Sequence, residues 1–354
     1  MRNMREKHKN EWVAASERMP ESFSRREAEM ECRDLEWNEM MKTANDLFAD
    51  GESIYKMLEK SCPENAEMLV CPGHMGDTLV IASLGKAYKE QHHIKALIFV
   101  IVTPPEELLC CFEGVDAVLP LDRFEMNCLD FYMQVKNLWY HGKIRLAHFR
   151  EEYLFNCPRL RMRNVDFDER CSFLESRWRM LDLNGGEASP LSVPPAENRE
   201  ELERQYGHAV LLMPVSYSAN LLPDYFWEKL TIAIRQKGYD VYTNYNGAAE
   251  ETVINGTEPL STSFYEFAQL TGVFALFVGL RSGLCDLISL TRQGELVVLY
   301  ADPKEGSDTA IRLTDERMNE SNIYDLGRRE GIECFYYNSE KEEELIDQIC
   351  KKLP

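Results

Sequence analysis

The chain repeats one pattern in both halves: short, continuous apolar runs alternate with segments of helical periodicity. Apolar runs of this length are typical of strands that are covered on both faces, and their alternation with helices predicts parallel sheets with right-handed crossovers. The apolar runs are residues 68–71, 95–102 and 117–119, followed by 209–213, 239–242, 273–278 and 295–300. The sequence therefore predicts an α/β protein with two successive Rossmann-like βαβ domains.

The 354 residues are enough for two domains, each with its own core. Residues 1–60 are rich in charge, with apolar residues at loose helical spacing, and we interpret them as a helical N-terminal extension, either solvated or packed on the body or a partner. Residues 61–184 form the first domain, which we expect to be mostly helical over 121–181. A linker rich in Gly and Pro covers 185–198, and residues 199–354 form the second domain, ending in a helix.

Two helix starts in the second domain carry a capping-box pattern. Ser263 is followed by Glu266, and Ser339 is followed by Glu342. A hydroxyl and a carboxyl at this spacing satisfy two backbone amides at a helix N-terminus. The pattern therefore predicts that one helix begins after Ser263 and the last begins after Ser339.

The formal net charge of −20 argues against a general nucleic-acid binder and against tight binding to an anionic membrane. No apolar run reaches the length of a membrane span, and no apolar segment follows the basic residues at the N-terminus. Eleven cysteines at irregular spacing, without a CxxC pair, fit reduced thiols in a cytoplasm. The histidines show no metal-ligand spacing, so we expect no metal site and at most peripheral membrane contact.

The first candidate site follows the first apolar run, in the turn from Gly73 through His74 and Gly76 to Asp77. Two glycines permit a tight turn and leave room for a ligand. Asp77 lies near the start of the next helix, where the helix dipole stabilises a carboxylate, and there it could take a proton from an acceptor hydroxyl. The alternative is that Asp77 caps the helix and the glycines only turn the chain.

The second candidate site is the turn from residue 279 to residue 286, between a strand and a helix. Ser282 is suited to capping this helix, and Gly283 lets the backbone approach a ligand closely. Free amides in a first helical turn form an anion site, to which Arg281 could add a contact with phosphate, and Asp286 could accept from a ribose or sugar hydroxyl. The alternative is an ordinary capped turn with a surface ion pair.

Two further loops follow strands of the second domain. Ser216 and Ser218 lie in the loop 214–220, where hydroxyls and amides could bind a diphosphate. Glu250 lies after the strand at 239–242, where it could bind a ribose. For each loop the alternative is a solvated polar segment.

The turn at Gly76 and Asp77, together with the second half of the chain, resembles glycosyltransferase family 9, the heptosyltransferase-like enzymes of the GT-B superfamily. The resemblance covers roughly residues 67–300, and in the second half it rests on PVSYSANLLPDYFWEKL, PLSTSFYEFAQL and VFALFVGLRSGLCDLISL. It implies a GT-B fold, with two Rossmann-like domains facing across a cleft. It also implies that Asp77 is the base and that Ser282, Gly283 and Leu284 form the turn that meets the donor diphosphate.

The activity implied by the resemblance is transfer of a sugar from a nucleotide-sugar to an acceptor hydroxyl of a glycan or glycolipid, with inversion and without a metal, in bacterial polysaccharide synthesis. The nucleotide-sugar is a co-substrate, and no other cofactor is expected. Arg281 stands where the family has an acidic residue, Asp286 where it often has His, and a phosphate-neutralising Lys is missing near Asn220. These differences leave open a catalytically inactive GT-B protein that binds nucleotide-sugar as a sensor or scaffold. A fucosyltransferase-like enzyme and a UDP-sugar epimerase are further alternatives.

Overall fold

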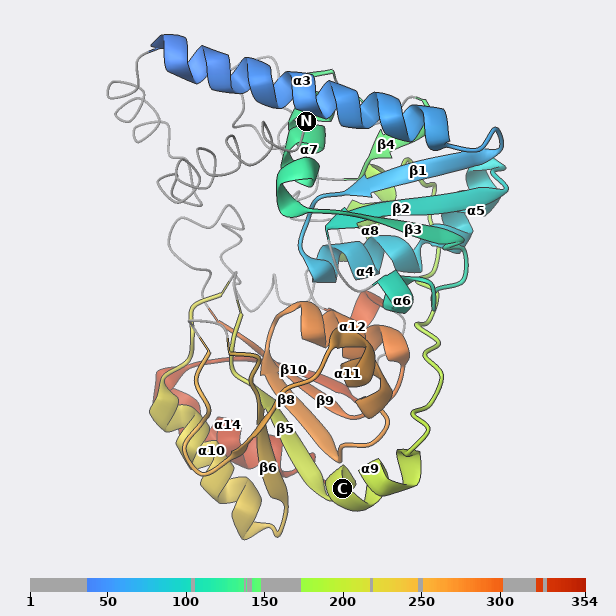
Figure 1. Ribbon diagram of the computed structural model, residues 1–354. Coiled ribbons are helices and arrows are strands. Elements are labelled where there is room, and N and C mark those ends of the chain that lie inside the picture. The colour runs from blue at the N-terminus through green and yellow to red at the C-terminus, as the bar shows by residue number, and fades with distance from the viewer. Residues whose placement is uncertain are drawn as a thin grey trace.

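The computed structural model contains two separate sheets, each made of parallel strands (Figure 1). Ser218, Glu250 and residues 1–36 of the expected N-terminal extension lie outside the described residues. The structure describes residues 37–102, 106–136, 138, 142–147, 173–216, 219–247, 251–301, 323–326 and 330–354.

The first sheet has four strands in the order β3-β2-β1-β4. They are β1 (Ala66–Cys71), β2 (Ala96–Val102), β3 (Ala117–Leu121) and β4 (Ile144–Leu146). Strand β4 lies inside the stretch that the sequence predicted to be mostly helical, and it pairs with β1 from Met68 to Val70. Three residues are too few to show a period, so local pattern could not reveal this strand.

The second sheet has six strands in the order β10-β9-β8-β5-β6-β7. They are β5 (Ala209–Met213), β6 (Asp240–Asn244), β7 (Glu258–Leu260), β8 (Leu276–Leu280), β9 (Leu296–Tyr300) and β10 (Ile332–Tyr336). Pro120 in β3 and Pro259 in β7 both lie on edge strands, the positions of a sheet in which proline is tolerated. Strand β8 begins three residues later than predicted, because Val273 and Phe274 continue the turn after the preceding helix by donating to the Leu270 carbonyl.

Helices cover both faces of the first sheet (Figure 1). The outer face packs on α3 (Trp37–Ser61) and α7 (Arg123–Val135), through a core that includes Met68, Val70 and Leu129. The opposite face, which is turned toward the second sheet, packs on the remaining helices of this half. These are α4 (Met75–Ser83), α5 (Gly85–His92), α6 (Glu106–Leu109) and α8 (Phe173–Met180).

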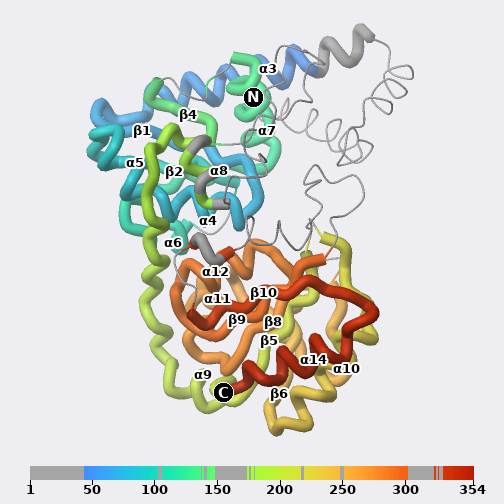
Figure 2. Tube along the Cα trace, turned by 180° about the vertical axis from the view of Figure 1, so that it is seen from behind, coloured from blue at the N-terminus to red at the C-terminus, as the bar shows by residue number. Residues whose placement is uncertain are grey.

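The second sheet is covered in the same way (Figure 2). Its outer face packs on α10 (Asp224–Gln236) and α14 (Glu342–Cys350). The face toward the first sheet packs on α11 (Phe264–Leu270) and α12 (Gly283–Thr291). The smaller elements are α9 (Arg199–Tyr206), η2 (Ile323–Leu326) and η3 (Ser339–Lys341).

One of the two predicted capping boxes is present. Ser263 and Glu266 satisfy each other's backbone amides at the start of α11, as the sequence predicted. The prediction at Ser339 was wrong, because the Asn338 side chain instead accepts from the Glu340 amide and starts a short 3₁₀ turn. Helix α14 begins only after that turn, at Glu342.

The segment between the two sheets is packed and hydrogen-bonded to both. The Ser189 amide donates to the carbonyl of Ser83 in the first half, and the Leu191 amide donates to the carbonyl of Leu290 in α12. The inner faces of the two sheets share one cluster of buried apolar residues, which extends from Leu69 and Phe99 to Leu211 and Phe277. Among the residues described, none of the helices combines the length and the apolar character that crossing a membrane requires.

Candidate active site

The two glycine turns that the sequence singled out meet face to face. Helix α4 begins just after β1, helix α12 begins just after β8, and their first turns are in direct contact. A Cβ placed on Gly76 would lie 2.8 Å from the Cα of Gly283, and one placed on Gly283 would lie 2.9 Å from the backbone nitrogen of Gly76. Real Cβ atoms do not approach other atoms so closely, so this contact requires glycine on both sides.

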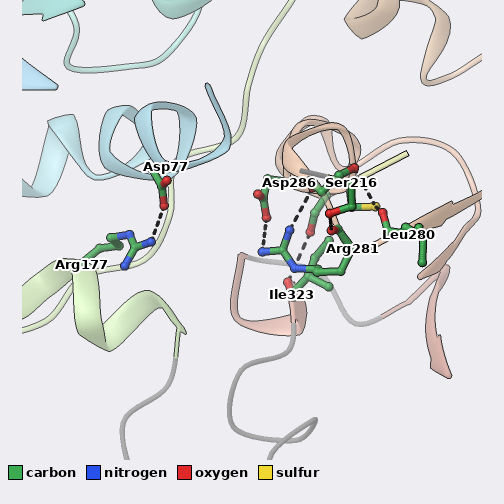
Figure 3. Close-up of polar contacts among 10 residues, drawn as sticks. Asp77, Arg177, Ser216, Leu280, Arg281, Asp286 and Ile323 are labelled. Atoms are coloured by element: carbon green, nitrogen blue, oxygen red, sulfur yellow. Dashed lines mark hydrogen bonds and ion pairs between the residues drawn. The ribbon is translucent and has the colours of Figure 1, made fainter. Parts of the chain in front are cut away.

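Asp77 lies in the first turn of α4 and does not cap it, since the N-cap is His74 and no side chain caps the helix. Its Oδ1 instead forms an ion pair with Nη2 of Arg177 in α8, at 2.5 Å (Figure 3). The Arg177 side chain is only 5% exposed, whereas that of Asp77 is 34% exposed. The carboxylate is therefore held from the interior and remains accessible from outside.

Arg281 and Asp286 form a second ion pair, on the α12 side of the contact (Figure 3). Nη2 of Arg281 lies 2.7 Å from Oδ1 of Asp286, and Nη1 donates to the Ser282 carbonyl at 2.9 Å. The same carbonyl accepts from the amides of Cys285 and Asp286. Arg281 thus bonds to both ends of the first turn of α12, which fixes the shape of that turn.

The amides that the sequence predicted for an anion site lie at the start of this helix. Residues Gly283 and Leu284 are its first two positions, where backbone amides have no acceptor within the helix. Ser282 occupies the N-cap, but its hydroxyl does not cap the helix and lies 3.8 Å from the Cys285 sulfur. Burial raises the pKa of the Cys285 thiol to about 11, so this thiol is not a nucleophile at neutral pH.

The remaining predicted residues lie around these two turns. The Ser216 hydroxyl is buried and donates to the Arg281 carbonyl at 2.8 Å, so it stabilises the turn that precedes α12. Gly73 and His74 precede α4, and a Cβ on Gly73 would lie 3.6 Å from Oδ2 of Asp77. The contact between the two turns brings together four predicted residues, namely Gly76, Asp77, Gly283 and Asp286.

Burial dominates the electrostatics of Asp286. It raises the pKa of this carboxyl, Arg281 lowers it, and the charge of Asp77 raises it further. Burial lowers the pKa of the Arg281 guanidinium, but Asp286, Tyr300 and Cys285 together raise it by more, so the group stays charged. The two ion pairs are thus close enough for each to influence the other across the domain contact.

Sequence reasoning missed two side chains of this region. Arg177 lies one hundred positions after its partner Asp77, within a segment rich in Arg and Glu, and nothing in that pattern distinguishes it. Tyr300 ends β9 beside the Arg281 and Asp286 pair, and burial raises its pKa. Its buried hydroxyl has no hydrogen-bond partner among the residues described. Among all the residues that the structure describes, no three His, Cys, Asp or Glu side chains form a group that could bind a metal.

Comparison with known proteins identifies the fold. No family model and no curated protein matches the chain. Among solved structures, a glycosyltransferase family 9 protein from Veillonella parvula matches with a TM-score of 0.52 and 12% identity, covering 82% of this chain and 98% of the other. The ADP-heptose LPS heptosyltransferase II of E. coli matches with a TM-score of 0.51 and 15% identity, covering 81% and 98%.

These matches and the two facing parallel sheets define the architecture as the GT-B fold of glycosyltransferases. These two solved structures are a heptosyltransferase and a protein of family 9, the family that the sequence motifs resemble. At identities this low, the similarity establishes the fold, and the chemistry has to be argued from the residues themselves.

Proposed function

We propose that this protein is a glycosyltransferase that moves a sugar from a nucleoside diphosphate sugar to an acceptor hydroxyl. The observation that carries the proposal is the direct contact between the turn that bears Asp77 and the amide-rich start of α12, at Gly76 and Gly283. A carboxylate from one domain and an anion-binding helix end from the other are the two groups that such a transfer needs.

In the proposed mechanism, Asp77 takes the proton of the acceptor hydroxyl as its oxygen attacks the anomeric carbon. The bond to the diphosphate breaks in the same step, so a single displacement inverts that carbon. Amides 283 and 284 and the dipole of α12 stabilise the negative charge that develops on the leaving diphosphate. The E. coli neighbour is an ADP-heptose LPS heptosyltransferase, so ADP-heptose is the first donor to test, and a bacterial glycan or glycolipid would supply the acceptor.

A catalytically silent nucleotide-sugar binder is the second candidate, and the ion pairs favour it. Arg281 is bound to Asp286 and Asp77 is bound to Arg177, so both groups are already engaged inside the protein. Such a protein would bind the nucleotide at α12 without turning over its sugar. The two candidates therefore differ in turnover and agree in binding.

Purified protein tests both candidates. Binding of ADP, UDP and GDP is measured by calorimetry, and ADP-heptose turnover is followed by release of ADP. Asp77→Asn is expected to lower turnover about 10²- to 10⁴-fold, since it removes a general base, with nucleotide affinity unchanged within about twofold because the α12 turn is intact.

Asp224→Asn is the matched control, because it removes an exposed first-turn carboxylate from α10, on the outer face. Unchanged turnover in Asp77→Asn would exclude Asp77 as the base. Nucleotide binding without turnover in the wild type would favour the silent binder. Absence of both binding and turnover would reject both candidate functions.

A further inference from the structure

We propose that Arg177 is the positioning residue of the catalytic carboxylate: it holds Oδ1 of Asp77 from the protein interior so that Oδ2 is presented to the acceptor. This inference rests on the proposed function, since it gives Asp77 the role of the base. The two side chains form the shortest ion pair of the site, at 2.5 Å, and they come from helices α4 and α8.

The placement of α8 makes Arg177 a fixed group. Leu174, Met180 and Leu181 lie in the buried cluster between the sheets, and α8 contacts both α4 and η2. The Arg177 side chain is almost completely buried. A guanidinium is costly to remove from water and is retained inside a protein only where strong partners compensate it. The Asp77 carboxylate is one such partner here.

The other oxygen of Asp77, Oδ2, belongs to a side chain that is 34% exposed. The position that a Cβ would occupy on Gly73 lies 3.6 Å from Oδ2, so glycine at residue 73 leaves this side of the oxygen uncovered. A bond from arginine to the first oxygen restricts the orientation of the carboxylate, and proton transfer needs the base within hydrogen-bond reach of the acceptor. Arg177 and Gly73 together therefore select the oxygen that reacts.

Several charged or titratable groups lie around Asp77. Arg177 faces it from α8, Asp286 faces it from α12, and the Cys71 thiol lies at the end of β1 with a pKa raised by burial and by Asp77. His74 occupies the N-cap of the same helix. Among these groups, Arg177 is the positive one in direct contact with the carboxylate, so it is the group that can orient the carboxylate.

Arg177→Met tests the proposal with ADP-heptose as donor and ADP as binding probe. We expect kcat to fall about 10²-fold, as for a misplaced reacting group, while the Kd of ADP stays within about twofold because the α12 turn is untouched. Arg177→Lys should restore part of kcat, since it returns the charge without the planar guanidinium.

Two comparisons separate positioning from a purely structural role. Arg145→Met removes another mostly buried arginine of the same domain, which pairs with Glu67 at the opposite end of β1, and it should lower stability without changing kcat below the unfolding temperature. In an Asp77→Asn background, Arg177→Met should add no further loss of turnover, because Arg177 acts through the group already removed.

The possible failures are distinguishable. If the wild type turns over donor and Arg177→Met retains its kcat, the role of Arg177 is rejected while the proposed function stands. Losses in the two single variants that multiply in the double variant would likewise reject action through Asp77, and would indicate that Arg177 contacts substrate itself. If the wild type neither binds ADP nor turns over donor, both the proposed function and this inference are rejected.

Discussion

The charge of Arg281 is paired inside the protein, where it stabilises the fold, and we do not assign it to ligand binding. Its guanidinium bonds to the Asp286 carboxylate and to the Ser282 carbonyl, at opposite ends of one helical turn. Asp286 is buried, so without Arg281 its charge would have no compensating partner at that distance. We therefore assign Arg281 to holding the turn in shape, and the donor diphosphate to the amides at residues 283 and 284.

Arg281→Met should lower the free energy of unfolding by about 3 kcal/mol at neutral pH, as expected for a buried pair that loses one partner. Burial already raises the pKa of Asp286, and loss of Arg281 raises it further. Between the unfolded pKa, about 3.9, and that higher value, the folded state binds a proton that the unfolded state has lost, so stability falls as pH rises. The deficit against wild type should therefore be smaller at pH 5 than at pH 7.5.

Denaturant unfolding at the two pH values measures this difference. Arg199→Met is the control, because Arg199 pairs with Glu203 on an exposed helix face, and loss of that pair should change stability by less than about 1 kcal/mol at either pH. A deficit for Arg281→Met that is equal at pH 5 and pH 7.5 would contradict the assignment of Asp286 as the group left uncompensated.

Some residues of the candidate site could be predicted from the local sequence, and others could not. Gly76, Asp77, Ser282 and Gly283 could be predicted, because glycine, serine and aspartate after an apolar run mark the C-terminal edge of a parallel sheet, where ligands bind. The partner of Asp77 could not, since Arg177 meets it only after the chain has folded. Nor could the engagement of Arg281 with Asp286 be distinguished from a contact to phosphate.

At the level of elements, the glycine contact sets how closely α4 and α12 approach. Alanine at Gly76 would place its Cβ 2.7 Å from Oδ2 of Asp286 as well as 2.8 Å from the backbone of Gly283. Backbone cannot give way as the end of a side chain can. The two helices, and with them the two halves of the site, would have to move apart.

We expect Gly76→Ala and Gly283→Ala each to lower the free energy of unfolding by about 1–3 kcal/mol, the range for overpacking. Each should also reduce ADP-heptose turnover, because separation of the helices separates Asp77 from the amides of α12. Gly85→Ala is the control: its Cβ would lie 3.4 Å or more from its neighbours, and alanine is favoured in a helix. Denaturation and turnover measure both effects, and wild-type values in both helix variants would show that the contact is not restrictive.

Most strands of five or more residues were predictable, including β3 at the edge of the first sheet, whereas the strands of three residues were hidden. Strands β1, β2, β5 and β9 are continuous apolar runs buried on both faces, so sequence alone reveals them. Strands β4 and β7 have three residues each, and β7 also contains Pro259. Their pairing depends on neighbours that lie far away in the sequence, so no local pattern predicts them.

For the whole molecule, the notable feature is that the apolar core crosses the boundary between the sheets. The inner faces of both sheets belong to one cluster, which includes Leu79 of α4, Leu109 of α6 and Leu287 of α12. The connecting segment adds hydrogen bonds to both halves at Ser189 and Leu191. A large apolar interface couples the stability of two domains, whereas a small polar one leaves them independent.

We therefore expect the chain to unfold in one cooperative transition. Leu287→Ala, at the shared cluster, and Leu129→Ala, in the outer core of the first half, should each cost about 2–5 kcal/mol. Both should shift the same single calorimetric peak, with calorimetric and van't Hoff enthalpies equal, because neither half retains its inner face once the other unfolds. Ile232→Ala, at an exposed position of α10, should leave the peak unchanged. Two resolved peaks, with Leu129→Ala moving only one of them, would show that the halves fold independently and that the shared cluster contributes little to holding the two turns of the site together.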